Sequence, residues 1–323
     1  MIKTPQFWKN KNFISELLIP FSVIYFIAIR LKYLLGSRKE PYEASVPVIC
    51  IGNPTSGGAG KTPTAISIAN LLKIHEKNIC FVSKGYKGNF KETIKVNINN
   101  HKASEVGDEP IILAKHATCF VCKNRREGIK AAEDDGAEII ILDDGLQDRT
   151  IRKDLTISVI DGNYGLGNQM LLPSGPLRDR LDISFKYTDL VLIIGNDNKD
   201  IKKEIPDNIP VVSAKMIPHE TPDKSVQYIA FAGIGMPDKF FFHLESIGLE
   251  LKRSIPFPDH YVYSERQVKS LLDDAAYVNA KLITTEKDAI KIEEKYLKDI
   301  VVYSASLHFD DNDDLLSHFK DLI

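Results

Sequence analysis

A glycine-rich loop between a predicted strand and a predicted helix limits most strongly what this chain can fold into. The segment reads VPVICIGNPTSGGAGKTP, in which an apolar, β-branched run ends at Gly52 and a helix begins at Lys61. A loop in this position surrounds an anion with backbone N–H groups and the positive end of a helix dipole. The usual template, G-x-x-x-x-G-K-[ST], requires a glycine where this chain has Thr55. We nevertheless predict a phosphate loop, because the strand and the helix supply the required context.

The residue types in this loop suit the binding of a nucleotide with Mg²⁺. Glycines let the backbone turn and approach a phosphate closely, Lys61 can reach the β and γ phosphates, and the Thr62 hydroxyl can ligate the metal. The alternative is a glycine-rich turn without a ligand, which the threonine in place of the leading glycine would favour. The predicted nucleotide-binding residues are Thr55, Ser56, Gly57, Gly58, Ala59, Gly60, Lys61 and Thr62.

A second predicted strand ends in two carboxylates. The segment AEIIILDDGLQDR is apolar up to Asp143 and Asp144, which is typical of the acidic strand end that holds Mg²⁺ opposite a phosphate loop. Asp-Asp-Gly alone would indicate only a turn after a strand. Together with the phosphate loop, it predicts that both carboxylates bind the metal directly or through its waters.

Short apolar runs alternate with helical patterns over most of the chain, which is the βαβ rhythm of a parallel sheet covered on both faces. The alternation begins at Val46, is interrupted by a polar, proline-containing stretch between about 197 and 225, and then resumes. We therefore predict an α/β fold in which residues 41–205 form a P-loop NTPase-type parallel sheet with helices on both faces. A second, smaller α/β/α domain is predicted over residues 206–323.

The N-terminal segment carries an uncharged apolar run, LLIPFSVIYFIAI, over residues 17–29. It is shorter than the roughly 20 residues that a spanning helix needs, and aromatic and basic residues flank it, as expected at a membrane surface. We predict a membrane-associated helix within residues 1–40 that anchors the chain on the cytoplasmic side. A buried core helix is the alternative, and a cleaved signal peptide is disfavoured because no small-residue cleavage site follows.

Charge and cysteine content disfavour some classes of function. The chain has 42 basic and 44 acidic residues, so no global field attracts a polyanion and nucleic acid is not expected as a partner. Cys119 and Cys122 form a CxxC, but no second CxxC or paired histidine completes a zinc site. We expect all four cysteines to be buried thiols in a reducing compartment.

Seven further stretches carry a resemblance to a known family. They are SKGYKG (83–88), VGDEP (106–110), DDGLQDR (143–149), LLPSGPLRD (171–179), AGIGMPDKFF (232–241), PDHYVYS (258–264) and TTEKDAIK (284–291). In this order, with the phosphate loop and the N-terminal apolar segment, they closely resemble the tetraacyldisaccharide 4′-kinase family of lipid A biosynthesis. The resemblance covers essentially the whole chain, and the family's usual loop also lacks the leading glycine.

The resemblance implies a membrane-associated kinase that uses ATP and Mg²⁺. Such an enzyme transfers the γ-phosphate of ATP to the 4′-hydroxyl of tetraacyldisaccharide 1-phosphate and produces lipid IVA at the cytoplasmic face of the inner membrane. The implied fold is two α/β/α domains with the active site in the cleft between them. The implied partners are the lipid substrate and the membrane surface, and we infer no obligate protein partner.

The resemblance also assigns catalytic roles to particular residues. By position, the catalytic base is Asp108 and the histidine paired with it is His260, while Lys61 neutralises phosphate charge. A carboxylate can accept the proton of a sugar hydroxyl as the phosphoryl group arrives, and a histidine can hold that carboxylate. Without the resemblance, Asp108 would be interpreted as an acidic residue at a helix start and His260 as a loop histidine.

The predicted metal site includes one residue that comes from the resemblance alone. Asp179 stands where the family usually has the acidic residue of GPLRE, and we expect it to join Thr62, Asp143 and Asp144 around Mg²⁺. Two stretches depart from the family pattern, since DGLQD stands for the usual DGFQH, with Leu146 in place of phenylalanine, and SKGYKG stands for SRGYGG. Asp148 replaces a common histidine, so any phosphate contact of that histidine is not carried over, and SKGYKG has Lys84 in place of an arginine with its planar fork.

Two other functions are compatible with the residues alone. An ATP-dependent ligase or carboxylating synthetase would use a related fold on a small soluble substrate, but it would leave the apolar N-terminus without a role. A membrane-bound nucleotide switch would hydrolyse ATP to change partners. The stretch TEKD does not supply the guanine-reading [NT]KxD, which disfavours a GTP switch.

Overall fold

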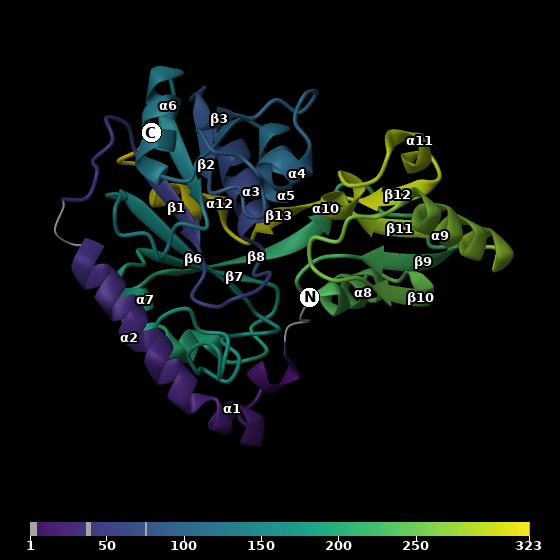
Figure 1. Ribbon diagram of the computed structural model, residues 1–323, viewed down its shortest axis with the longest axis horizontal. Helices are drawn as coiled ribbons and strands as arrows, with labels where there is room; N and C mark the ends of the chain where they lie inside the picture. The colour runs from purple at the N-terminus through teal and green to yellow at the C-terminus, as the bar shows by residue number, and fades with distance from the viewer. Residues whose placement is uncertain (1–4, 37–39, 75, 323) are drawn as a thin grey trace. The chain divides into compact units, whose positions relative to one another are not determined.

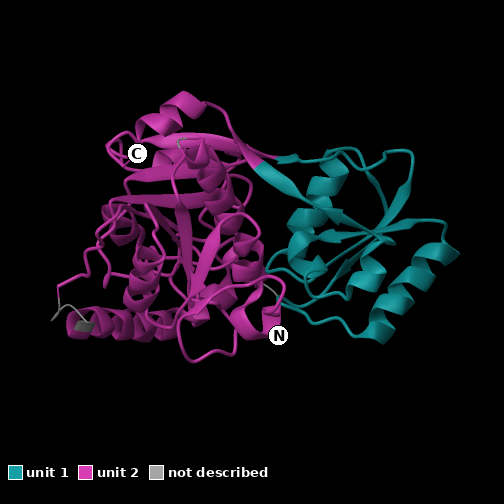
Figure 2. Cartoon of the chain, turned by 90° about the horizontal axis from the view of Figure 1, so that it is seen from above, with its two compact units in different colours: residues 1–4, 217–306 teal, residues 5–216, 307–323 magenta. Residues whose placement is uncertain are grey.

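The chain folds into two compact units, which Figure 2 shows in different colours. The computed structural model describes residues 5–36, 40–74 and 76–322. The larger unit, here called the core unit, consists of residues 5–216 and the segment from 307 onward. The small unit consists mainly of residues 217–306.

A nine-stranded sheet in the order β13-β8-β7-β6-β1-β5-β2-β4-β3 organises the core unit (Figure 1). β1 pairs in parallel with β5 and β6, and the pairs β2–β5, β2–β4, β6–β7 and β7–β8 are also parallel, whereas β3 joins β4 antiparallel. The predicted parallel-rich sheet is therefore confirmed. Its strands are β1 (Val48–Gly52), β2 (Ile79–Ser83), β3 (Ile94–Lys95), β4 (Thr118–Val121), β5 (Ile139–Asp143), β6 (Leu155–Asp161), β7 (Leu190–Ile194), β8 (Val211–Pro218) and β13 (Ala305–Phe309).

Helices follow most of these strands. The helix after the phosphate loop begins at Lys61, as predicted. The helical segments of this unit are η1 (Gln6–Trp8), α1 (Phe13–Leu17), α2 (Ile19–Gly36), α3 (Lys61–Lys73), α4 (Ala103–Val106), α5 (Asp108–Ala114), α6 (Arg125–Asp134), α7 (Leu181–Lys186), η2 (Ile201–Glu204) and α12 (Asn312–Ser317).

Alternate side chains of β1 show that both faces of the sheet are covered. Cys50 packs in a cluster with Ile129 of α6, whereas Ile49 and Ile51 point to the opposite face and are also fully buried. α3 contacts both β1 and β5. The cysteines at 50, 80, 119 and 122 are buried and unbridged, so the prediction of buried thiols is confirmed.

The small unit has a four-stranded sheet in the order β10-β9-β11-β12, and each neighbouring pair is parallel. A capping box at Ser264 starts its longest helix, which buries Val268 and Leu271 against the sheet. The elements of this unit are β9 (Gln227–Ala232), α8 (Pro237–Ser246), β10 (Glu250–Pro256), α9 (Glu265–Tyr277), β11 (Lys281–Thr285), α10 (Glu286–Ala289), α11 (Glu294–Leu297) and β12 (Ile300–Tyr303).

The division into units corrects the predicted domain ranges of 41–205 and 206–323. The boundary lies after Met216, inside β8, and the chain returns to the core unit at Leu307, inside β13. The return is explained by pairing and by a hydrogen bond, because β13 is the neighbour of β8 and the Leu307 amide donates to Ser67 Oγ of α3 at 3.1 Å. The C-terminal residues therefore complete the first sheet and do not belong to the second domain.

The N-terminal apolar run forms the end of α1 and the first half of α2. Among residues 5–36, 40–74 and 76–322, no helix has both the length and the apolar content that crossing a bilayer demands. The alternative of a buried core helix is wrong, because Phe21, Ile24 and Leu31 of α2 are 58%, 63% and 53% exposed. α2 therefore lies on the surface with large apolar side chains in contact with solvent.

Candidate active site

Parallel pairing of β1 with β5 brings the glycine-rich loop beside the acidic strand end. Ile51 of β1 is in register with Asp143 of β5, so both strands end at the same edge of the sheet. The carboxyl ends of parallel strands form the usual ligand crevice of such sheets. The structure thus places the two predicted phosphate and metal elements together.

The first half of the loop is fastened to the segment that precedes α7. Thr55, which is 7% exposed, forms a bridge with Leu177, and the Ser56 amide donates to the Pro176 carbonyl at 2.6 Å. The Ser56 amide is therefore committed to the protein. Of the predicted nucleotide-binding residues, Thr55 and Ser56 shape the loop, which leaves close approach to a phosphate to the glycines that follow.

The second half of the loop has the backbone that a phosphate cradle needs. Gly60 is the N-cap of α3 and has a φ of +91°, a left-handed conformation that favours glycine. Gly57 has a φ of +123° and Ala59 is buried. A Cβ added at Gly58 would meet no heavy atom of the described residues within 4 Å, so this position borders open space.

Lys61 and Thr62 begin α3 directly after the loop. The Lys61 Nζ lies 3.2 Å from Asn53 Oδ1 and 3.6 Å from Asp144 Oδ1. This ammonium group bridges the phosphate loop and the acidic strand end, where it can meet phosphate oxygens and the metal ligands together. Thr62 is half-buried in the first turn of the same helix.

Asp143 is a buried carboxylate with an unsatisfied oxygen. Its side chain is 5% exposed, and its Oδ1 has no hydrogen-bond partner among the residues that the structure describes. Burial, together with the negative charge of Asp144, raises the pKa of Asp143 to about 7. An orphaned buried carboxylate is costly unless a cation binds it, so the residues at this edge fit the divalent cation that the sequence predicted.

Asp144 is held in an uncommon backbone conformation by strong cationic contacts. Its φ is +55°, and its Oδ1 accepts a hydrogen bond from Arg178 Nη1 at 2.7 Å. Burial would raise the pKa of Asp144, but Lys61 and Arg178 outweigh it and hold the pKa at about 2. Asp144 is therefore charged throughout the physiological range.

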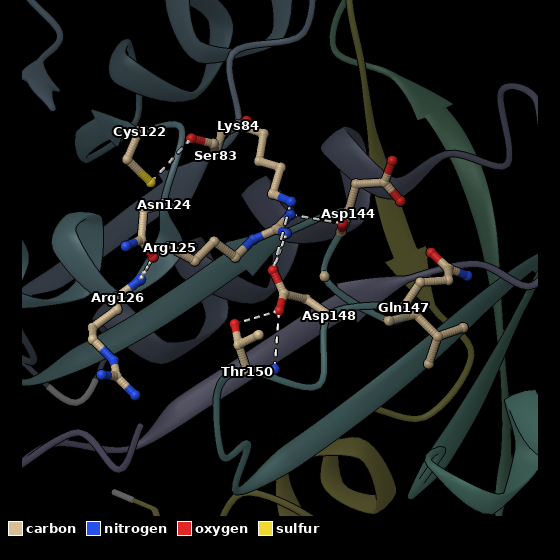
Figure 3. A network of polar contacts seen from close by, with 12 residues as sticks. Ser83, Lys84, Cys122, Asn124, Arg125, Arg126, Asp144, Gln147, Asp148 and Thr150 are labelled. Carbon is tan, nitrogen blue, oxygen red and sulfur yellow. Dashed lines mark hydrogen bonds and ion pairs between the residues drawn. The ribbon is translucent and has the colours of Figure 1, made fainter. Parts of the chain in front are cut away.

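Arg125 supports this acidic strand end, and Figure 3 shows its guanidinium group beside Asp144 and Asp148. It is the first residue of α6, is only 4% exposed, and donates from Nη2 to the carbonyl oxygens of Asp143 at 2.9 Å and Asp144 at 2.7 Å. Its Nη1 donates to Asp148 Oδ2 at 2.9 Å. Asp148 also accepts hydrogen bonds from Thr150, which completes a network behind the two metal-binding candidates.

Asp148 acts here as the counterion of Arg125. Burial would raise its pKa, but the charge of Arg125 and the hydrogen bonds from Thr150 hold the pKa of Asp148 well below its usual range. Lys84 lies 3.7 Å from the same carboxylate. Asp148 and Lys84, both at positions where the sequence departs from the expected motifs, thus belong to one ion-pair cluster with Arg125.

Asp108 is buried at the start of α5 in the core unit. The preceding Gly107 has a φ of +97°, and a Cβ there would lie 2.9 Å from the Tyr86 carbonyl oxygen. Close packing of the SKGYKG turn against VGDEP therefore fixes where Asp108 begins its helix. The packing explains why both motifs contain glycine.

His260 belongs to the small unit, where its side chain is 6% exposed. Its amide donates to the Gly233 carbonyl at 2.9 Å, and its Nε2 lies 3.5 Å from Lys287 Nζ and 3.6 Å from Asp259 Oδ2. Three of the quoted motifs thus meet around this histidine. The pairing of His260 with Asp108 stays a prediction, because the two residues belong to different units.

Asp179, which was predicted as a metal ligand, forms ion pairs with arginines in the structure. It is 3% exposed, and its carboxylate forms ion pairs with Arg30 of α2 and with Arg149, the latter at 3.5 Å. Its Oδ1 also accepts the Arg180 amide at 2.9 Å. These contacts occupy both oxygens of Asp179, whereas Asp143 Oδ1 has no partner among the described residues, and metal binding by Asp179 stays a prediction.

Three residues of this centre were not predicted. Arg178 lies in LLPSGPLRD and Asn53 in the phosphate-loop segment, and the sequence assigns neither of them a role, although both contact predicted residues. Arg125 begins α6 shortly after β4 ends at Val121, and this position near the carboxyl end of a strand is the available signal. The charged stretch RREGIKAAED, which Arg125 begins, is instead typical of a solvent-exposed helix.

Comparison with known proteins identifies the family that shares this arrangement. The family model described as tetraacyldisaccharide-1-P 4′-kinase matches residues 14–323. The chain belongs to this family. Two similar proteins named tetraacyldisaccharide 4′-kinase come from Paramagnetospirillum magneticum, at 38% identity over 312 residues, and Rhodospirillum rubrum, at 34% over 316 residues. In each case the match covers 96% of this chain and 95% of the relative.

A solved structure of the tetraacyldisaccharide 4′-kinase family has the same fold. The crystal structure of LpxK from Aquifex aeolicus in complex with ATP matches with a TM-score of 0.77 and 27% sequence identity. The match covers 96% of this chain and 99% of that chain. The family, the mixed α/β fold and the kinase class predicted from the sequence are therefore confirmed.

Proposed function

We propose that this chain transfers the γ-phosphate of ATP to the 4′-hydroxyl of tetraacyldisaccharide 1-phosphate and so forms lipid IVA, a step of lipid A biosynthesis. The observation that carries the proposal is the contact of Lys61 with Asp144 beside the orphaned carboxylate of Asp143. This arrangement is what phosphoryl transfer requires, namely a cation for the phosphates and carboxylates for a metal. It occurs in a chain whose relatives are named for this reaction.

ATP and Mg²⁺ would bind at the edge formed by β1 and β5. The glycines from 57 to 60 and the N-terminus of α3 would bind the phosphates, and Lys61 would neutralise charge that develops during transfer. Thr62, Asp143 and Asp144 would hold Mg²⁺. The metal, when bound, would neutralise phosphate charge as the bond to the leaving oxygen weakens.

Asp108 is proposed as the group that accepts the proton of the 4′-hydroxyl, and His260 as the group that orients it. In this step the hydroxyl oxygen forms a bond to the γ-phosphorus, the bond from that phosphorus to the bridging oxygen of ADP breaks, and the hydroxyl proton moves to the carboxylate. The loose transition state of phosphoryl transfer needs only modest help from a base. Positioning and charge neutralisation would therefore supply most of the rate enhancement.

The surface of α2 supports a place at the cytoplasmic face of the inner membrane. Its exposed side carries large apolar side chains, among them Phe21, Ile24 and Leu31. Exposed apolar area of this kind is stabilised by a lipid surface. A monotopic helix would bring the kinase to a substrate whose acyl chains lie in the bilayer.

The proposed reaction is tested by transfer of labelled γ-phosphate from ATP with Mg²⁺ to tetraacyldisaccharide 1-phosphate in mixed micelles. We expect labelled lipid IVA from the wild type, a loss of about 10²- to 10³-fold in Lys61→Ala, and a loss of about 10²- to 10⁴-fold in Asp108→Asn. Lys203→Ala is the matched control, because this lysine is 75% exposed and lies on η2. It should retain the wild-type rate.

Two outcomes would count against the proposal. ATP hydrolysis without labelled lipid, from folded protein in working micelles, would favour a nucleotide switch or a ligase with a small substrate. Wild-type transfer in Asp108→Asn would remove the base assignment but leave the reaction intact. A flotation assay with vesicles tests the membrane surface separately, since Ile24→Asn and Leu31→Asn should weaken vesicle binding without lowering ATP affinity.

A further inference from the structure

The side of α2 that faces the core unit is unusually polar for a helix with such an apolar surface. Ser22 is buried, and the other residues that turn inward recur at helical spacing. The inward set is Ser22, Tyr25, Phe26, Ile29, Arg30 and Tyr33. A surface helix normally buries its apolar face, whereas Ser22, Tyr25, Arg30 and Tyr33 turn polar groups toward the core unit.

These polar contacts converge on the segment of residues 171–179. Ser22 Oγ donates to the Leu171 carbonyl at 2.9 Å and lies 2.7 Å from Ser174 Oγ. The Tyr25 hydroxyl donates to the Arg178 carbonyl at 3.0 Å. α2 thereby contacts both ends of this segment, because Ser22 reaches Leu171 at its start and Arg30 reaches Asp179 at its end.

The contact of Arg30 with Asp179 is an ion pair. Asp179 is almost fully buried and also faces Arg149, whose guanidinium lies 4.0 Å from the ring centroid of Tyr33 of α2. A buried carboxylate between two guanidinium groups has little freedom to move. The pair therefore fixes the end of the segment against the helix.

The opposite side of the same segment contacts the phosphate-transfer centre. The Arg178 amide donates to the Pro54 carbonyl at 2.9 Å, and its guanidinium donates to Asp144. Leu177 forms the bridge with Thr55 of the phosphate loop. Adjacent residues thus point in opposite directions, with Asp179 toward α2 and Arg178 toward the acidic strand end.

We infer that Arg30 and Asp179 form a positioning pair through which α2 holds Arg178 against Asp144. This inference rests on the proposed function for the identity of the nucleotide and the lipid. It gives the surface helix a second role besides contact with the membrane, because the helix forms part of the support of the active site. It also assigns Asp179 a role other than metal binding.

The test is a double-mutant cycle on Arg30→Gln and Asp179→Asn, with kcat, the KM for ATP and the Mg²⁺ concentration at half-maximal rate measured for each protein. Small misplacements of catalytic groups can cost on the order of 100-fold in rate. We expect each single variant to lose about 10- to 100-fold in kcat. The double variant should have a kcat no lower than that of the slower single variant. In all three variants the Mg²⁺ concentration at half-maximal rate should change by less than about twofold.

Conservative and surface variants provide the controls. Arg30→Lys restores the charge without the planar fork and should recover most of the kcat lost in Arg30→Gln. Arg152→Gln removes an exposed pair with Glu43 in the same unit and should leave every parameter unchanged. Thermal unfolding of each variant shows whether a loss of rate accompanies a loss of folded protein.

The competing role of Asp179 gives a different pattern. If Asp179 binds the metal, Asp179→Asn should raise the half-saturating Mg²⁺ concentration by about tenfold or more while Arg30→Gln leaves it unchanged. That pattern, or additive losses in the double variant, would overturn the positioning pair. So would a folded Arg30→Gln with wild-type kcat.

Binding of Mg²⁺–ATP by calorimetry separates this inference from the proposed function. Should the wild type bind ATP but label no lipid, the proposed function fails and the cycle is evaluated on ATP affinity. The positioning pair then predicts that both single variants weaken ATP binding several-fold and that the double variant is no weaker. Wild-type ATP affinity in both single variants would contradict it.

Discussion

Asp143 and Asp288 are both buried aspartates near the carboxyl end of a parallel strand, one in each unit, yet their surroundings are opposite. Asp288 is fully buried and accepts hydrogen bonds from the Gly233 amide and the Tyr263 and Thr285 hydroxyls, and pairs with Lys291 Nζ at 2.8 Å. Asp143 has an Oδ1 without a partner among the described residues. Burial raises its pKa to about 7.

The difference separates a carboxylate that stabilises the fold from one kept for a ligand. A buried carboxylate whose oxygens all accept hydrogen bonds fixes the donor groups around it. Asp288 thereby holds the loops that carry Gly233 and Tyr263. The Gly233 carbonyl in turn accepts the His260 amide. A buried carboxylate with an unused oxygen costs stability. The proposed Mg²⁺ at the end of β5, beside Lys61, would compensate this cost.

Asp143→Asn tests the ligand side of the comparison and should give the largest effect. We expect a loss of about 10²- to 10³-fold in kcat, because one carboxylate of the metal site is gone. The free energy of unfolding without Mg²⁺ should be unchanged or higher, since the variant removes an unsatisfied buried charge. Transfer assays and urea unfolding measure the two quantities, and a variant that is both active and destabilised would contradict this assignment.

Asp288→Asn should produce the opposite result. Removing this charge leaves Lys291, whose side chain is 4% exposed, without its buried counterion. We expect the small unit to lose about 3 to 5 kcal/mol of stability. Urea unfolding, monitored by a spectroscopic signal of Tyr263, measures this loss of unfolding free energy. An unchanged unfolding midpoint would show that Asp288 does not support the fold.

Stabilisation by Mg²⁺–ATP should distinguish the same two variants. A ligand at 100 times its Kd stabilises the folded state by about 2.7 kcal/mol. Asp288→Asn should retain this ligand-induced increase from its lower starting point, whereas Asp143→Asn should lose most of it. Thermal unfolding with and without the ligand provides the measurement, and an equal increase in both variants would remove the contrast.

Asp148 in the core unit resembles Asp288, because donors surround its carboxylate. Arg125 and Thr150 donate hydrogen bonds to it. Asp148→Asn should cost about 2 kcal/mol at pH 7. The folded-state pKa of Asp148 is lowered, so its contribution is present above the unfolded pKa of about 3.9 and is lost as pH falls further.

Unfolding at several pH values checks this sign. The gap between wild type and Asp148→Asn should be constant from pH 7 to about pH 5 and should narrow below pH 4. A gap that widens as pH falls would mean that the charge of Asp148 does not stabilise Arg125. Asp148→His should lose stability at pH 7 because Arg125 then lacks its anion.

The sequence was sufficient for the parts of the fold that depend on local pattern. Apolar runs such as VICIG and IIILD became the central strands, and the glycines around Lys61 became the left-handed turns before α3. The position of Asp143 and Asp144 beside the phosphate loop followed from two parallel strands ending at one edge. The strands and the loop turns are encoded locally, whereas the position of Asp143 and Asp144 beside the loop also depends on the long-range pairing of β1 with β5.

The contacts that the sequence did not predict join distant segments. Arg125 lies in a charged stretch that resembles a solvated helix face, and only the packing of α6 on the sheet buries it. Asp179 could be placed in the metal site from its motif, but its partner Arg30 lies in a helix assigned to the membrane. The return of residues from 307 onward to the first sheet depends on pairing with β8 across a whole inserted unit.

The most direct test of the account is the rate of labelled phosphate transfer to tetraacyldisaccharide 1-phosphate as Mg²⁺ is titrated, with wild type, Asp143→Asn and Asp288→Asn compared at equal concentrations of folded protein. The account predicts saturable transfer in the wild type, saturation at the same Mg²⁺ concentration in Asp288→Asn, and little transfer at any concentration in Asp143→Asn. Wild-type Mg²⁺ dependence in Asp143→Asn would contradict the assignment of the metal to the end of β5.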